Sequence, residues 1–244
     1  MGKTRKWKWG LFFALCLLIT AAVLNNPVTK SPIDGAPEPA GTPAPQGPLA
    51  GCAVCLDPGH GGYDGGAYGR DSGTPEKELN LDVALRLAGL LRERGAAVTL
   101  TRETDTALAD AGENRKRRDL QARVDAAASA DLFLSIHMNE YRTRSQSGPQ
   151  VFYRKGQEGS RLLAGVLQQS LNAALSPARP RSAQTGDYYV LRQLAIPAVL
   201  VECGFLSNAA EEQKMLDPDY RQRLAQAIAD GVEEYWALAP EHKQ

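Results

Sequence analysis

Short apolar runs alternate with longer amphipathic segments over most of the chain. The runs lack the polar residue at every second position that marks a strand with one wet face, so they predict strands buried on both faces. The predicted strands are 51–57, 96–102, 131–137, 149–155 and 197–205, with 188–194 as a short strand or turn. The run at 149–155 is more polar than the others, which favours the edge of a sheet.

Four segments carry apolar residues at helical spacing. They are 74–95, 114–130, 159–175 and 217–238. Thr74 can cap the first helix and Gly95 can end it, and Asp217 can cap the last. Strands that are apolar throughout and alternate with helices predict an α/β fold, with a mostly parallel sheet covered on both faces in three layers.

The N-terminal 49 residues differ in composition from the rest. Four basic residues precede an apolar run of 16 residues, Trp9 to Leu24. This pattern predicts a signal peptide or, as we favour, an uncleaved signal-anchor over residues 1–24, with the basic end in the cytoplasm and the remainder outside. Residues 25–49 hold seven prolines and three glycines and predict an extended linker. One globular domain is then expected over residues 50–240.

Charge limits the classes of partner. The whole chain has 28 basic and 28 acidic residues, but five of the basic and only two of the acidic ones lie in the first 49. The globular part is therefore slightly acidic, which argues against nucleic-acid binding. The basic run NRKRRDLQAR is typical of a solvated helix face, with contact to an anionic wall, a membrane or a protein partner as the alternatives.

Cys52 and Cys55 form a C-x-x-C pair inside a predicted strand. Residues three apart in a strand point to opposite faces, and the sequence offers no second pair. These residues are therefore predicted to be core thiols rather than a metal or redox site. Cys203 also lies in an apolar strand, a context that does not favour a nucleophilic thiolate.

The candidate chemistry lies where apolar runs end. Two of them run into His60 and His137, a third runs into Glu202, and Glu76 lies in the first turn of the helix after the glycine-rich stretch. The carboxyl ends of parallel strands meet at one edge of a sheet. Two imidazoles and a carboxylate are the ligands of an open catalytic zinc site, and a further carboxylate would serve as general base. On these grounds alone, either glutamate could be the ligand.

Other chemistries match less well. The stretch GHGGYDGG has Asp64 at the sixth position of a dinucleotide fingerprint. No G-K-[ST] follows a glycine-rich loop, and neither G-x-S-x-G nor H-E-x-x-H occurs in the sequence. These gaps disfavour a phosphate-binding loop, a serine hydrolase of the nucleophile-elbow type and a helix-borne zinc protease.

Six segments give the sequence a family resemblance. They are LDPGHGGYDGGAYG, EKELNL, VTLTRETD, DLQARV, SIHMN and PAVLVECGFLSN. Across Cys55–Asn208 the chain resembles the zinc-dependent N-acetylmuramoyl-L-alanine amidases of the Amidase_3 type. The resemblance implies the amidase/hydrolase fold, with Zn²⁺ bound by His60, Glu76 and His137 and with Glu202 as catalytic residue. It implies hydrolysis of peptidoglycan at the amide between N-acetylmuramic acid and L-alanine of the stem peptide.

Within that family the chain is most similar to spore-cortex amidases of the CwlD type. It shares their short N-terminal anchor, their single catalytic domain and the arginine-rich segment before DLQARV. This implies a sporulation and germination role, in the forespore intermembrane space, as a step towards muramic δ-lactam. A polysaccharide deacetylase would be the functional partner, and a regulatory protein partner stays open. Met138, where the family usually has alanine, could narrow the cleft or touch the glycan.

Three further residues are candidates with open roles. Asp57 is expected either to hydrogen-bond a ligand histidine or to form the turn before Pro58. Asn139 would orient a ligand or substrate or hold its loop, and Arg123 would pair with an acidic residue near the site. The alternative functions are a zinc exopeptidase acting on wall-derived peptides and a non-enzymatic wall-binding domain.

Overall fold

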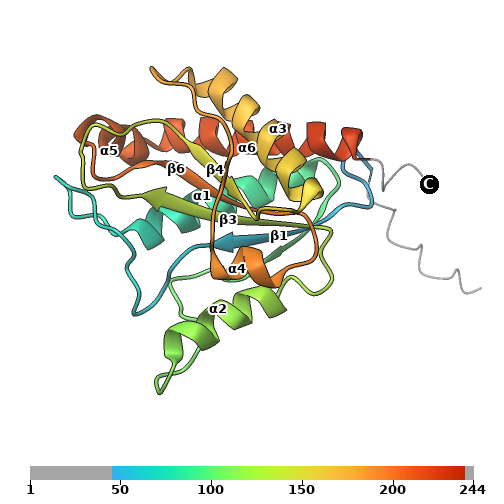
Figure 1. Ribbon diagram of the computed structural model, residues 1–244, viewed down its shortest axis with the longest axis horizontal. Coiled ribbons are helices and arrows are strands. Elements are labelled where there is room, and N and C mark those ends of the chain that lie inside the picture. The colour runs from blue at the N-terminus through green and yellow to red at the C-terminus, as the bar shows by residue number, and fades with distance from the viewer. Residues whose placement is uncertain (1–45, 240–244) are drawn as a thin grey trace, which may run out of the picture. The chain divides into compact units, whose positions relative to one another are not determined.

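A mixed β-sheet runs through residues 46–239, the part of the chain that the computed structural model describes (Figure 1). Its strands are β1 (Ala53–Pro58), β2 (Ala97–Leu100), β3 (Leu132–Asn139), β4 (Gln150–Tyr153), β5 (Gln184–Thr185) and β6 (Ala198–Phe205). Their order across the sheet is β2-β1-β3-β6-β4-β5. The β2, β1, β3 and β6 strands are parallel, and β4 runs antiparallel to β6. The predicted mostly parallel sheet is confirmed.

Helices cover both faces of this sheet. They are α1 (Glu76–Glu93), α2 (Arg115–Asp125), α3 (Glu158–Leu175), α4 (Tyr189–Gln193), α5 (Ala209–Leu216) and α6 (Pro218–Leu238). The α1, α3 and α6 helices lie on one face, and α2 and α4 lie on the other (Figure 1). The predicted three-layer α/β/α architecture is confirmed.

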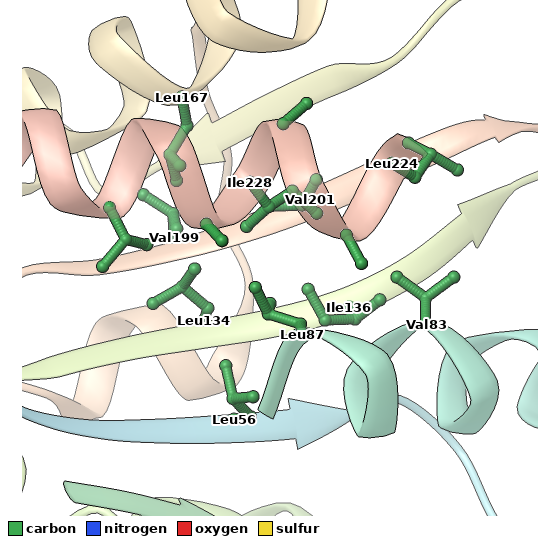
Figure 2. Close-up of a cluster of buried hydrophobic side chains, with 14 of the residues drawn as sticks. Leu56, Val83, Leu87, Leu134, Ile136, Leu167, Val199, Val201, Leu224 and Ile228 are labelled. Carbon is green, nitrogen blue, oxygen red and sulfur yellow. The ribbon is translucent and has the colours of Figure 1, made fainter. Parts of the chain in front are cut away.

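The larger part of the core lies between the sheet and α1, α3 and α6. Figure 2 shows leucine, isoleucine and valine side chains from both layers meeting there. They include Leu56, Leu134, Ile136, Val199 and Val201 from the sheet and Val83, Leu87, Leu167, Leu224 and Ile228 from the helices. A second cluster lies under α2 and α4, where Phe133 and Leu200 point the other way from their strands. Because successive strand residues alternate between two apolar layers, these strands are apolar throughout.

Cys52 and Cys55 enter opposite layers of this core. Cys52 lies in the larger cluster and Cys55 in the smaller one, and both are free thiols. Burial raises the pKa of each to about 12, with a nearby aspartate adding to the shift. Burial likewise raises the pKa of Cys203 well above the usual range. The prediction of inert core thiols is confirmed for these three cysteines.

Three elements differ from the sequence prediction. Residues 188–194, predicted as a strand or turn, contain the short helix α4. The α5 helix was not predicted, although the Asn208 side chain caps it by accepting from the backbone N–H groups of Ala210 and Glu211. The β5 strand has two residues and pairs with β4, so the expectation that 149–155 forms the sheet edge is wrong.

Two of the three predicted helix boundaries are confirmed. The Asp217 side chain caps α6 by accepting from the N–H of Asp219 at 2.9 Å. Gly95 ends the first helix region with a φ of +94°, a conformation that glycine adopts without strain. The prediction for Thr74 is wrong, because Pro75 is the N-cap residue of α1 and the Thr74 hydroxyl instead accepts from Ser72.

The predicted signal-anchor (1–24) and nearly all of the predicted linker (25–49) lie outside the described residues. Within residues 46–239, no helix combines the length and the apolar character that a membrane span requires.

Candidate metal and catalytic site

The side chains of His60, Glu76 and His137 converge at one end of the sheet. His60 follows β1, His137 lies near the end of β3, and Glu76 is the first residue of α1. One Glu76 carboxylate oxygen, Oε1, lies 2.9 Å from Nδ1 of His137. The other, Oε2, lies 3.2 Å from Nε2 of His60. One donor atom from each of the three residues lies within 4.8 Å of the other two, so the group could hold a metal ion.

Glu202 lies beside this group. It faces His137 across the parallel β3–β6 pair, so both project from neighbouring strands at the same level. The β3 strand continues to Asn139 and the β6 strand to Phe205. His137 and Glu202 therefore lie within their strands, whereas the sequence suggested that they lie at the strand ends. The Glu202 side chain is almost fully buried, and its Oε2 has no hydrogen-bond partner among residues 46–239.

The glycine-rich stretch allows the backbone to approach these side chains closely. A Cβ atom on Gly59 would lie 2.2 Å from Cε1 of His137, and one on Gly66 would lie 2.5 Å from Oε2 of Glu76. His60 itself has a φ of +61°, which is uncommon for a residue other than glycine. The stretch is therefore shaped around the three candidate ligands.

Charges set the protonation of the group. Burial by itself would lower the pKa of His60, but Asp64 and Glu76 outweigh it and raise that pKa to about 9. Asp64 Oδ2 lies 3.0 Å from Nδ1 of His60, off the line of a good hydrogen bond. Burial would raise the pKa of Glu76, yet His137 and His60 hold it well below its usual range. Glu76 is therefore an anionic oxygen donor.

The Glu202 carboxyl behaves in the opposite way. Burial raises its pKa to about 7, with His137 opposing the shift and the negative charge of Glu76 adding to it. A carboxyl group with a pKa near neutrality can both take up and release a proton under ordinary conditions. The two glutamates thus differ in chemistry, although the sequence left them interchangeable.

Asp57 does not hydrogen-bond either histidine. Its carboxylate accepts from the hydroxyls of Thr101 and Ser135, each at 2.7 Å, and from Nη1 of Arg123 at 2.6 Å. Burial would raise the pKa of Asp57, but Arg123 and the two hydroxyls hold it below its usual range. The expectation that Asp57 hydrogen-bonds a ligand histidine is therefore wrong, and its charged partner is Arg123.

Arg123 has the acidic partners that the sequence predicted. Besides Asp57, it binds the carboxylate of Asp119 through Nε at 2.9 Å. Its remaining N–H groups donate to the backbone carbonyls of Pro58 at 2.9 Å and His60 at 2.6 Å. Arg123 therefore holds in place the backbone that carries His60.

Two residues that support the group were not predicted. Asn80 donates from Nδ2 to Oε1 of Glu76 at 3.1 Å, one helical turn along α1. Arg102, which is buried, donates to the carbonyls of Pro58 and Gly59. The position of Asn80 four residues after Glu76 on a predicted helix is a signal that could have identified it.

The residues after His137 have different environments. The Met138 side chain is buried in the larger core cluster, and Met138 also borders the cavity next to the candidate ligands, so its effect on the cleft stays a prediction. Its backbone N–H donates to Oε1 of Glu76 at 3.1 Å. Asn139 is half-buried at the cavity wall, and its carbonyl accepts from the N–H of Leu206. A role of the Asn139 side chain towards a ligand or substrate stays a prediction.

A cavity of about 400 Å³ opens over the group. The candidate ligands and Glu202 line it, together with Tyr188. Two imidazole nitrogens and one carboxylate oxygen are a donor set that suits Zn²⁺ and leaves coordination positions open. The residues present therefore fit a catalytic zinc ion facing a cavity large enough for part of a substrate.

Comparison with known proteins adds a family match. The model of the Amidase_3 family, described as N-acetylmuramoyl-L-alanine amidase, matches residues 54–234. The germination-specific N-acetylmuramoyl-L-alanine amidase of Bacillus subtilis is 36% identical over 195 residues, which cover 78% of this chain and 81% of that protein. The amidase LytC of the same organism is 39% identical over 193 residues, which cover 78% of this chain and 36% of LytC.

Solved structures agree with this match. The CwlD amidase from Clostridioides difficile, determined in complex with the GerS lipoprotein, superposes with a TM-score of 0.74 at 34% identity, covering 77% of this chain and all of that one. The catalytic domain of CwlV, an amidase from Bacillus (Paenibacillus) polymyxa, gives a TM-score of 0.68 at 34% identity, covering 77% of this chain and 99% of that one.

Proposed function

The chain belongs to the Amidase_3 family and is an N-acetylmuramoyl-L-alanine amidase, and we propose that it cleaves peptidoglycan with Zn²⁺ bound by His60, Glu76 and His137 and with Glu202 as catalytic residue. The single observation that carries the proposal is the convergence of these three donors beside a buried carboxyl group that has a raised pKa. The bond cleaved is the amide between N-acetylmuramic acid and L-alanine.

Several residues of the chain hold the candidate metal ligands in position. Asn80, the N–H of Met138 and the two histidines fix the Glu76 carboxylate, and Arg123 holds the backbone of His60. When bound, zinc lowers the pKa of water and polarises a carbonyl group. The arrangement of partners keeps the ligands in place before substrate arrives, as the supporting contacts of metal sites do.

Glu202 transfers a proton from the attacking water to the leaving amine. Its buried Oε2, free of any hydrogen bond within the described residues, accepts a proton from the water that attacks the lactyl carbonyl carbon. As the C–N bond breaks, the same carboxyl group gives that proton to the nitrogen of L-alanine, which leaves as a free amine. A pKa of about 7 suits both transfers.

The test is Glu202→Gln, which keeps the shape of the side chain and removes its proton chemistry. We expect the kcat for a muramoyl peptide to fall by a factor of about 10²–10⁴, with the zinc content unchanged. Glu140→Gln is the matched control, because Glu140 also lines the cavity but is exposed. A Glu202→Gln enzyme that retains wild-type kcat would overturn the assignment.

We further propose that the substrate is spore cortex and that hydrolysis is a step towards muramic δ-lactam, with a polysaccharide deacetylase acting on the product. The similarity to a germination-specific amidase and to CwlD supports this. The catalytic domain would work outside the cytoplasm, tethered by residues 1–24. Muropeptide analysis of spores lacking the protein should show no muramic δ-lactam, and a normal δ-lactam content would limit the role to other wall material.

The CwlD structure also bears on protein partners, since that amidase was determined with the GerS lipoprotein. We propose that this chain, too, works with a protein partner at the membrane. Purification of the tagged full chain from sporulating cells should recover a lipoprotein in stoichiometric amount.

A further inference from the structure

A second hollow lies between α2 and α4, next to the catalytic cavity. Its walls are mainly Lys116, Arg117, Leu120, Tyr189, Arg192 and Gln193, and we call it the basic hollow. Its volume is about 640 Å³. The hollow contains part of the basic run that the sequence singled out and that the catalytic proposal does not use.

The basic hollow adjoins the catalytic cavity directly. Lys116, Leu120 and Tyr189 line both. Lys116 forms an ion pair with Asp64, and Asp64 in turn lies 3.0 Å from Nδ1 of His60. A substrate bound at the candidate metal group can therefore extend into the basic hollow.

Cations dominate this hollow. None of its lining residues is acidic, whereas Lys116, Arg117 and Arg192 all contribute positive charge. Within residues 46–239, the Arg117 guanidinium has no ion pair or hydrogen bond. The ion pair between Arg192 and Asp187 competes only weakly with a bound anion, because the Asp187 side chain is 85% exposed. The hollow is thus suited to an anionic group.

The wall formed by α4 is fixed in position. Tyr189 donates from its hydroxyl to Oε1 of Gln121 on α2 at 2.7 Å. The Arg192 guanidinium lies 5.9 Å from the centre of the Tyr189 ring. Arg192 therefore lines the hollow beside this ring, with its side chain 44% exposed.

A third hollow adjoins the catalytic cavity and has a different lining. It begins at Asn139 and is lined by side-chain amides, aromatic rings and one cation, Arg181. That guanidinium already donates to Ser147, Gln146 and Gln150 and lies over the ring of Phe205. Of these two hollows, the one between α2 and α4 therefore has more cationic side chains available to an anion.

The charge on the proposed substrate is distributed in the same way as the charge on the two hollows, with one charged part and one uncharged part. The lactyl carboxyl group of the glycan is consumed in the scissile amide, whereas the stem peptide beyond L-alanine ends in a free carboxylate. We propose that the basic hollow binds the carboxylates of the stem peptide, with Arg117 and Arg192 as specificity-determining residues. The peptide then runs between α2 and α4, and the uncharged glycan faces the third hollow. This inference rests on the proposed function.

The test compares a synthetic muramoyl peptide having free carboxylates with the same compound amidated at each of them. Wild-type enzyme should prefer the free acid, and added salt should reduce the preference. The Arg117→Gln/Arg192→Gln variant should raise KM for the free acid about tenfold and leave kcat and the amidated substrate unaffected. Arg223→Gln, an exposed arginine on α6, is the matched control and should behave like wild type.

Equal wild-type activity on both substrates would overturn the inference and leave the amidase assignment intact. Absence of activity on both would instead contradict the proposed function. If the double variant loses activity only on intact walls carrying phosphate polymers, the hollow serves those polymers and the stem-peptide assignment is wrong.

Discussion

Gly66 is the residue at which the shape of the loop and the candidate metal group meet most closely. Its φ is +70°, and an added Cβ would collide with Oε2 of Glu76. Gly66→Ala should therefore displace the carboxylate and weaken zinc affinity by about 10–100-fold, the range seen when contacts that orient a ligand are lost. Isothermal titration with zinc measures this.

Gly73→Ala provides the control for that experiment. Gly73 has the same φ of +70° but no atom within 4 Å of an added Cβ. Both variants thus carry the same backbone strain, of about 1 kcal/mol, and only Gly66→Ala adds the collision. If the two variants bind zinc equally well, Gly66 has no special relation to Glu76.

Asp57 carries a second prediction at this scale. Its pKa is lowered in the folded state, so its charge stabilises the protein above the usual aspartate range of about 3.9 and loses that effect as pH falls through the folded value. Asp57→Asn should cost about 3–5 kcal/mol at pH 7, because it leaves Arg123 buried without this partner. Urea unfolding at pH 7 and at decreasing pH measures the difference.

The difference between wild type and Asp57→Asn should shrink steadily below pH 4. Asp125→Asn, an exposed aspartate on the same helix as Arg123, should change stability by less than about 0.5 kcal/mol. A gap between wild type and Asp57→Asn that stays constant down to pH 2 would show that the Asp57 charge does not act as described.

At the residue scale, the sequence indicated which side chains lie together where a polar residue interrupts or follows an apolar strand. His60, His137 and Glu202 stand out in this way, and the structure brings all three together. Asn80 lies one helical turn after Glu76 and could have been identified, whereas Arg102 was missed because its partners are backbone carbonyls that only the fold brings near. Asp57 was misjudged for the same reason, since its partner Arg123 is 66 residues away.

At the scale of elements, periodicity identified the long helices and the buried strands. It failed for α4, with five residues, and β5, with two, because such short segments offer no full period of the pattern. The α5 helix was missed although Asn208 is a good capping residue and acidic residues follow it. A capping residue followed by acidic residues can therefore indicate a short helix even where no long amphipathic stretch is present.

Asn208 supplies the prediction for this scale. Its side chain accepts from the first N–H groups of α5 and donates to the carbonyl of Gln146 at 3.0 Å. Asn208→Ala should lower the free energy of unfolding by about 1–2 kcal/mol, and Asn208→Asp, which keeps the cap acceptor, should lose less. Thermal unfolding of both variants checks this, and equal losses would mean that the cap contributes nothing.

At the scale of the whole molecule, the parallel arrangement explains why the site lies where it does. The β1, β3 and β6 strands are neighbours and point the same way, so His60, His137 and Glu202 reach one end of the sheet from three separate parts of the sequence. The α1 helix then starts at that end and contributes Glu76. The alternation of strands and helices along the sequence was enough to predict the layers. The position of β4 and β5 beyond β6 was not predictable, because strand pairing leaves no local pattern in the sequence.

The most direct test of the account is mass analysis of the products released from purified peptidoglycan by the zinc-loaded protein. The account predicts stem peptides with a free amino group on L-alanine, together with glycan strands whose muramic acid carries a free lactyl carboxyl group. Cleavage within the stem peptide or within the glycan, with the muramoyl–L-alanine bond left intact, would contradict it.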